Sequence, residues 1–131
     1  MNLTATKTTL TKEEEMNEKK RNFATMIIKT YPIQNEHDLE VIKQKQKIIF
    51  LSKLELADLQ EDLKKLEGQL VTADSYDGVL LEKTRKKHQQ EIDDLTKSIV
   101  IAEEVIITLK QIIKRREEDV AREQKILEEL D

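Results

Sequence analysis

The side chains that could support metal chemistry are two histidines and 27 acids, because the chain has no cysteine. A zinc or di-metal site in a helical protein needs several histidine and carboxylate ligands that converge from facing helices. His88 and Glu91 lie one helical turn apart and Asp94 follows them, but no second histidine–carboxylate pair lines up with them. We therefore expect no metal and no cofactor, and we interpret His88 as a polar residue in a helix seam.

A second candidate is the acidic segment Asp74-Ser75-Tyr76-Asp77, in the only concentration of turn-forming residues in the second half of the chain. Aspartate and serine at such a place favour capping of the next helix. Paired acids at a hairpin tip also resemble the RNA-polymerase secondary-channel factors, which present such acids to a metal-containing active site. The resemblance covers only this tip and the hairpin, without the zinc-finger cysteines of one such group or a globular β domain. It implies an alternative function, a small regulator or inhibitor that acts on an enzyme through Asp74 and Asp77.

The sequence contains no further pattern for catalysis: there is no glycine-rich phosphate loop and no nucleophile–base arrangement. Basic clusters occur at 19–21, 43–47, 85–87 and 114–116. Three consecutive helical residues spread over about 200° of the helix circumference, acids neighbour most clusters, and no aromatic residues are interleaved for base stacking. We therefore expect no enzyme activity, and a nucleic-acid-associated factor is a second alternative only.

The composition favours long helices over a compact globule. Of the 131 residues, 38% are charged and 3% are aromatic, and the formal net charge is −4. Such a mixture, rich in Glu, Lys, Leu and Ile, is typical of coiled coils. No apolar run is long enough for a membrane span and the first ten residues lack the apolar core of a signal peptide. We expect an intracellular, cytoplasmic protein.

Two seven-residue ladders of aliphatic residues define the expected helices. One consists of Ile42, Ile49, Leu56, Leu63 and Leu70, and the other of Ile92, Ile99, Ile106, Ile113, Val120 and Leu127. They predict two helices, one over 35–71 with Asn35 as its N-cap and one over 79–131. A loop over 72–78 joins them in an antiparallel hairpin. A turn centred near residue 75 pairs Leu56 with Leu95, Ile49 with Ala102 and Ile42 with Leu109.

A third, shorter helix is expected over 11–31, after a disordered segment over 1–10. Thr11 and Glu14 fit a capping box, and Pro32 is expected to end or kink the helix. This helix either folds back to cover the wide apolar zones at 48–56 and 99–113, or continues the next helix past Pro32 and brings Phe23 opposite Leu127. The wide zones favour the first arrangement. The expected fold is therefore all-α, one helical domain over 11–131 with a three-helix bundle in the middle.

The expected function is that of a structural or adaptor protein that dimerises or docks on a larger assembly through apolar helix faces. Protein is the expected partner, either a second copy or a complex subunit. The candidate contact residues are Val120, Leu127 and Leu130, which overhang if the first helix folds back, and Leu59, Leu63 and Leu66, which face the polar stretch 82–91.

Overall fold

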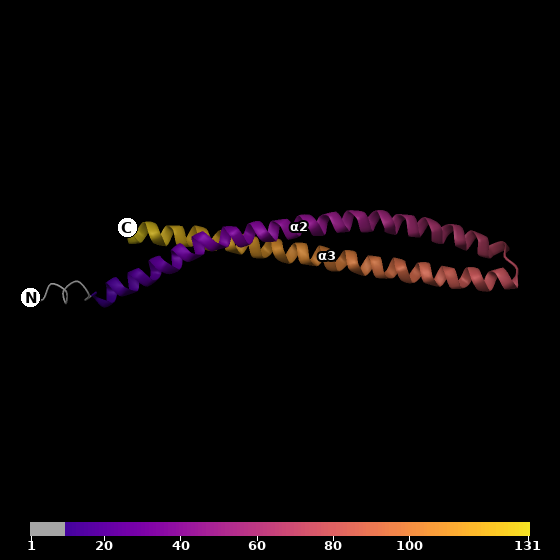
Figure 1. Ribbon diagram of the computed structural model, residues 1–131, viewed down its shortest axis with the longest axis horizontal. Coiled ribbons are helices and arrows are strands. Elements are labelled where there is room, and N and C mark those ends of the chain that lie inside the picture. The colour runs from indigo at the N-terminus through magenta and orange to yellow at the C-terminus, as the bar shows by residue number, and fades with distance from the viewer. Residues whose placement is uncertain (1–9) are drawn as a thin grey trace, which may run out of the picture. The chain divides into compact units, whose positions relative to one another are not determined.

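The computed structural model describes residues 10–131, and this part of the chain consists of two α-helices and no strand. Helix α2 spans Lys12–Thr72 with 61 residues, and α3 spans Ser75–Leu130 with 56 residues. Only two residues link them, and α3 returns beside α2 (Figure 1). The all-α class is confirmed. The disorder was expected for residues 1–10, of which residues 1–9 lie outside the described residues.

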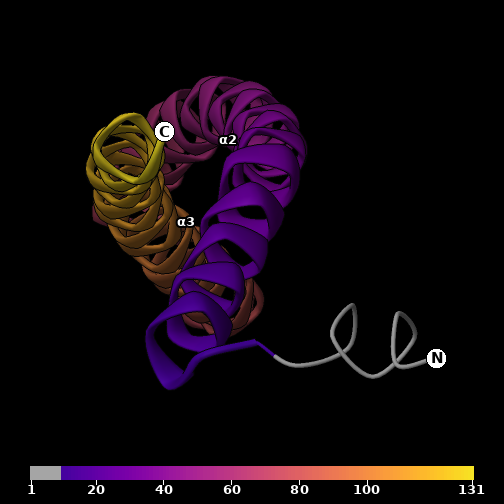
Figure 2. The same cartoon turned by 90° about the vertical axis from the view of Figure 1, so that its left-hand side faces the viewer.

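Helix α2 runs without a break through Pro32, where the sequence predicted that the helix would end or kink. Figures 1 and 2 draw this helix as one continuous ribbon. A proline inside a helix costs about 3 kcal/mol because it removes a hydrogen bond and crowds the preceding turn. Burial of apolar side chains in the turns before Pro32 offsets that cost, since Ala24 and Ile27 are 0% and 4% exposed and burying one isoleucine contributes about 2–3 kcal/mol. The separate helix over 11–31, and the three-helix bundle built on it, are therefore wrong. Asn35 is a buried mid-helix residue rather than an N-cap.

Side-chain caps define where the two helices begin. The backbone N–H of Glu14 donates to the Thr11 hydroxyl oxygen at 3.1 Å, as the predicted cap requires. The backbone N–H of Asp77 donates to a carboxylate oxygen of Asp74 at 2.8 Å. Because Asp74 caps it, α3 begins at Ser75, earlier than the predicted residue 79, and the loop is shorter than the predicted 72–78.

The described residues group into two compact units. The first contains the residues up to Leu39 together with Lys110–Asp131, and the second contains Glu40–Leu109. Within each unit, a segment of α2 packs against a segment of α3 through a narrow aliphatic stripe. The buried aliphatic residues are Ala24, Ile27 and Ile113 in the first unit, and Ile42, Ile92, Ile99, Ala102 and Ile106 in the second. Ile42 belongs to the first predicted ladder, and Ile92, Ile99, Ile106 and Ile113 belong to the second.

Candidate interaction surfaces

A polar layer interrupts the aliphatic stripe of the first unit. A guanidinium nitrogen of Arg116 donates to the side-chain oxygen of Asn35 at 3.3 Å and forms a short ion pair with Asp38. The Asn35 amide nitrogen in turn donates to the backbone carbonyl of Ile113 at 3.5 Å. Asn35 is 8% exposed, and the side chains of Arg116 and Asp38 are 22% and 16% exposed. The three side chains therefore satisfy one another within a largely water-excluded seam.

We expect this polar layer to fix which residues of the first unit face each other. A shift of α3 by one heptad would remove the partners of Asn35 and would leave Arg116 opposite aliphatic residues. Burying an unpaired charge is costly, and a single asparagine in a heptad seam is known to specify register. The charge of Arg116 is therefore paired inside the chain.

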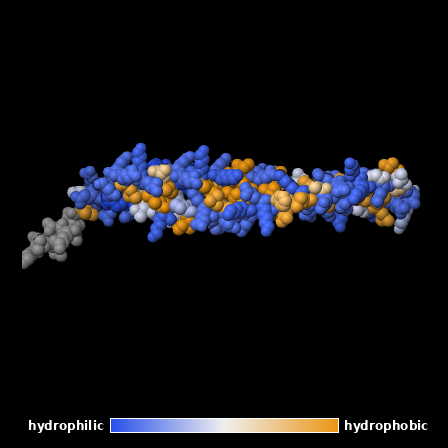
Figure 3. All heavy atoms as spheres, turned by 90° about the horizontal axis from the view of Figure 1, so that it is seen from above, coloured by the Kyte–Doolittle hydropathy of each residue, from blue (hydrophilic) through white to orange (hydrophobic). Residues whose placement is uncertain are grey.

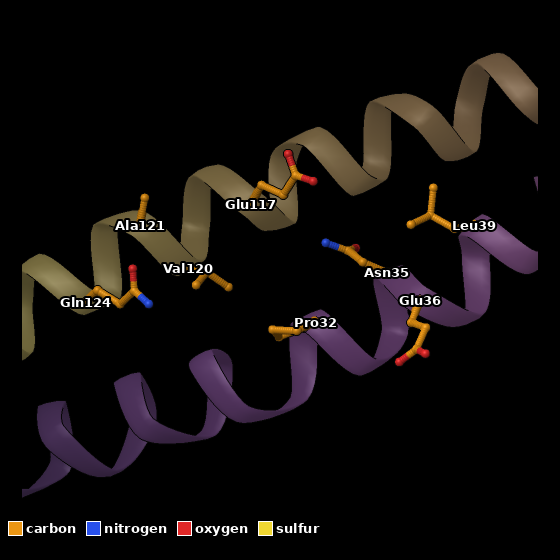
Figure 4. Close-up of a pocket in the computed structure, with 8 residues that line it drawn as sticks. All are labelled: Pro32, Asn35, Glu36, Leu39, Glu117, Val120, Ala121 and Gln124. Atoms are coloured by element: carbon orange, nitrogen blue, oxygen red, sulfur yellow. The ribbon is translucent and has the colours of Figure 1, made fainter.

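Val120, Leu127 and Leu130 are half-buried. Because α2 continues past Pro32 toward its N-terminus, it lies beside the last turns of α3, and no overhang of these residues forms in the first unit. Figure 4 shows Val120 pointing toward α2 near Pro32, where a shallow groove of about 330 Å³ lies between the helices. The role of the three residues in binding a partner stays a prediction.

A second groove of the first unit, of about 260 Å³, tests the predicted position of Phe23. Phe23 lines this groove with Ile126 and Leu130, and the charged residues Lys20 and Glu123 border it. Phe23 thus lies beside the last turns of α3, as the arrangement with a continuous α2 predicted. Its side chain is nevertheless 54% exposed, so α3 covers only part of the ring.

In the second unit, Leu59, Leu63 and Leu66 are also half-buried. The polar stretch predicted to face them contains Arg85, which donates two hydrogen bonds to the carboxylate of Glu82, at 2.9 and 2.6 Å. These bonds lower the pKa of Glu82, and the carboxylate raises the pKa of Arg85. The charges are thus neutralised along α3 itself, and a partner-binding role of the three leucines stays a prediction.

The acidic tip and His88 have local partners in the second unit. Asp74 accepts the capping hydrogen bond described above, which is the structural role predicted for it, and Asp77 lies in the first turn of α3. Nδ1 of His88 lies 3.0 Å from the carbonyl oxygen of Thr84 and can donate to it. Among residues 10–131, no three His, Cys, Asp or Glu side chains come together as metal ligands. In the same range, neither helix has an apolar run that could cross a bilayer.

The second unit exposes large apolar side chains away from its buried stripe. Among them are Ile48, Phe50, Leu51 and Leu54 on α2 and Val100, Ile101 and Ile107 on α3, with exposed fractions between 47% and 63%. We call these two groups the 48–54 patch and the 100–107 patch. Val71, Tyr76, Val79 and Leu80, near the link between the helices, are exposed as well. Figure 3 shows apolar atoms reaching the surface among hydrophilic ones. The sequence indicated that the zones of the two patches are wide apolar faces, and it predicted that a third helix would cover them. Because α2 is continuous, no separate third helix is present in residues 10–131 to do so.

Comparisons with known proteins do not extend this description. A scan against protein-family models, a search of curated proteins and a search of solved structures each found no match.

Proposed function

We propose that this chain is a non-enzymatic structural or adaptor protein that works by binding protein chains through exposed apolar helix faces. The observation that carries the proposal is the pair of patches at 48–54 and 100–107, whose members are about half exposed or more. Isolated apolar residues on a surface are ordinary, whereas larger contiguous apolar patches mark sites of protein–protein or membrane contact.

The hairpin itself cannot cover these patches. The stripe between α2 and α3 uses the first and fourth heptad positions, such as Ile42 and Ala102, which are 4% and 8% exposed. Phe50 and Ile101 occupy other heptad positions, so rotating either helix to bury them would expose the present stripe. A helix that is apolar over such a wide arc needs a neighbour besides its hairpin partner.

The shape of the surfaces also favours binding of a chain over catalysis. The grooves of the first unit are open troughs between two helices, and they hold no arrangement of nucleophile and base. An active site usually needs a concave pocket that excludes water and converging polar groups. An exposed apolar helix face is instead the surface that another helix recognises.

The proposal is tested with a tagged full-length chain and a variant that carries Phe50→Lys and Ile101→Lys. Sedimentation velocity measures self-association, and chemical cross-linking with mass spectrometry compares the proteins captured by the two forms. We expect the variant to keep its helicity by circular dichroism and to lose self-association or the bound proteins. A control variant with Gln60→Lys and Gln90→Lys, both at exposed positions of the same unit, should behave as the unmodified chain. An unmodified chain that is monomeric and captures the same proteins as the variant contradicts the proposal.

A further inference from the structure

We propose that the partner of the 48–54 patch is a second copy of this chain, with α2 lying antiparallel against α2 of the other copy. This inference rests on the function proposed above and adds to it the identity and the orientation of the partner. The pattern of charge on both sides of the patch carries it.

The relevant surface is the outer stripe of α2 within the second unit. Its members follow one another at alternating intervals of four and three residues, which places them on one face of the helix. They are Glu40, Gln44, Lys47, Leu51, Leu54, Asp58, Glu61 and Lys65, and all of them are exposed. The stripe lies on the side of α2 away from Ile42, Ile49 and Leu56, which face α3.

The outer stripe is complementary to itself in the antiparallel direction. A two-fold axis midway between Leu51 and Leu54 places each of these leucines opposite the other in the second copy. The same axis places Lys47 opposite Asp58. Each contact occurs twice, because a two-fold interface is made of the same surface on both subunits.

The complementarity continues to the ends of the stripe. The two-fold axis brings Glu40 opposite Lys65 of the second copy. Lys65 already lies 3.7 Å from Glu61 in its own chain, but these side chains are 69% and 68% exposed, so the pair is weak and leaves Lys65 able to contact a second acid. One contact beside the stripe is unfavourable, because Lys43 comes near Lys64 of the second copy and the two positive charges repel each other.

A parallel arrangement of the two copies does not fit the stripe. It would place Lys47 against Lys47 and Asp58 against Asp58, so every charged position would meet its like, which destabilises helix pairing.

The corresponding stripe of α3 does not have this symmetry. Ile101 stands between Lys97 and Glu104, so a two-fold axis on either side of Ile101 places this isoleucine opposite a charge. We therefore assign self-association to α2 and not to α3.

A charge-reversal series on the full-length chain tests the inference by sedimentation equilibrium. We expect a dimer, whose dissociation constant rises about tenfold or more with Lys47→Glu and likewise with Asp58→Lys, since each change replaces two attractive pairs by two repulsive ones. The double variant with Lys47→Glu and Asp58→Lys should recover the dimer. The two positions lie 11 residues apart on one helix and cannot contact each other within one chain, so recovery reports a contact between copies. Lys97→Glu, an equal charge change on α3, should leave the dissociation constant unchanged.

Cross-linking tests the orientation, because the chain has no cysteine of its own. A mixture of the Lys47→Cys and Asp58→Cys chains should form the mixed disulfide, while Lys47→Cys alone should not couple with itself. A disulfide between two Lys47→Cys chains, or a double charge reversal that does not recover the dimer, overturns the proposal. A monomeric chain that still captures another protein through Phe50 and Ile101 overturns self-association but supports the proposed function. A monomeric chain with no such capture contradicts both.

Discussion

The ion pair between Asp38 and Arg116 should be energetically coupled far more strongly than an ion pair on the surface. Removing one partner of a fully buried pair costs about 3–5 kcal/mol, whereas an exposed pair contributes about 0–1 kcal/mol. The two side chains are 16% and 22% exposed, so we expect a coupling free energy of about 2 kcal/mol. Arg116→Ala should cost about 3 kcal/mol, because it also removes the hydrogen bond to Asn35, worth about 1 kcal/mol.

A double-mutant cycle measures this coupling directly. Asp38→Ala should cost about 2 kcal/mol, and the double variant should cost about 3 kcal/mol rather than the additive value of about 5 kcal/mol. The assay is urea unfolding followed by circular dichroism at one protein concentration, because self-association would raise the apparent stability.

The control is the ion pair of Lys53 and Glu103 in the second unit, with a 3.6 Å separation and side chains that are 60% and 47% exposed. The same cycle there should give a coupling below about 0.5 kcal/mol. A coupling between Asp38 and Arg116 that is no larger than this control value would refute the reasoning that the polar layer holds the register of the first unit.

Three further changes test other parts of the fold. Asp74→Ala should cost about 1 kcal/mol by removing the N-cap of α3 and should speed amide hydrogen exchange in its first turn, whereas Asp77→Ala, which keeps the capping carboxylate, should not. Pro32→Ala should raise the free energy of unfolding by up to about 3 kcal/mol, because it restores a helix hydrogen bond; an unchanged urea midpoint would contradict this. The hydrogen bonds from Arg85 lower the pKa of Glu82. Their contribution to the stability of the fold is therefore present above the ordinary glutamate pKa and is lost as pH falls through the lowered pKa. NMR titration should show Glu82 ionising below ordinary glutamates, and Arg85→Gln should return it to the ordinary range.

The hairpin was predictable because a repeat of seven leaves one apolar stripe per helix, and a short link allows two such stripes of one chain to be buried against each other. The heptad spacing that includes Ile42 and Ile92 is enough to indicate which helix faces pack. The continuity of α2 was not predictable from local rules, because the cost of Pro32 is local while the burial of Ala24 and Ile27 that offsets it depends on α3.

The polar layer was not predicted, for a related reason. Asn35 stands three residues after Pro32, where an asparagine is a good helix cap, and the local pattern favours that role. It also stands seven residues before Ile42, in phase with the aliphatic ladder, and this spacing is the signal that could have identified it as a seam residue. Its hydrogen-bond partner is Arg116, far away in sequence, so neither polar residue indicates the layer without the other.

A stripe of burial has a consequence for function that a globular core does not have. Within residues 10–131, each helix buries one face against the other helix, and a further apolar face is open to another molecule. In the second unit, the inner face of α2 packs against α3 through Ile42, Ile49 and Leu56. The outer face of α2 carries Leu51 and Leu54 between charges of opposite sign. Substitutions on the inner face should therefore lower the free energy of unfolding, while substitutions on the outer face should change association and leave the fold intact. Comparing Ile106→Ala with Leu54→Ala by urea unfolding and sedimentation separates these two effects, because only the former removes a side chain from the buried stripe.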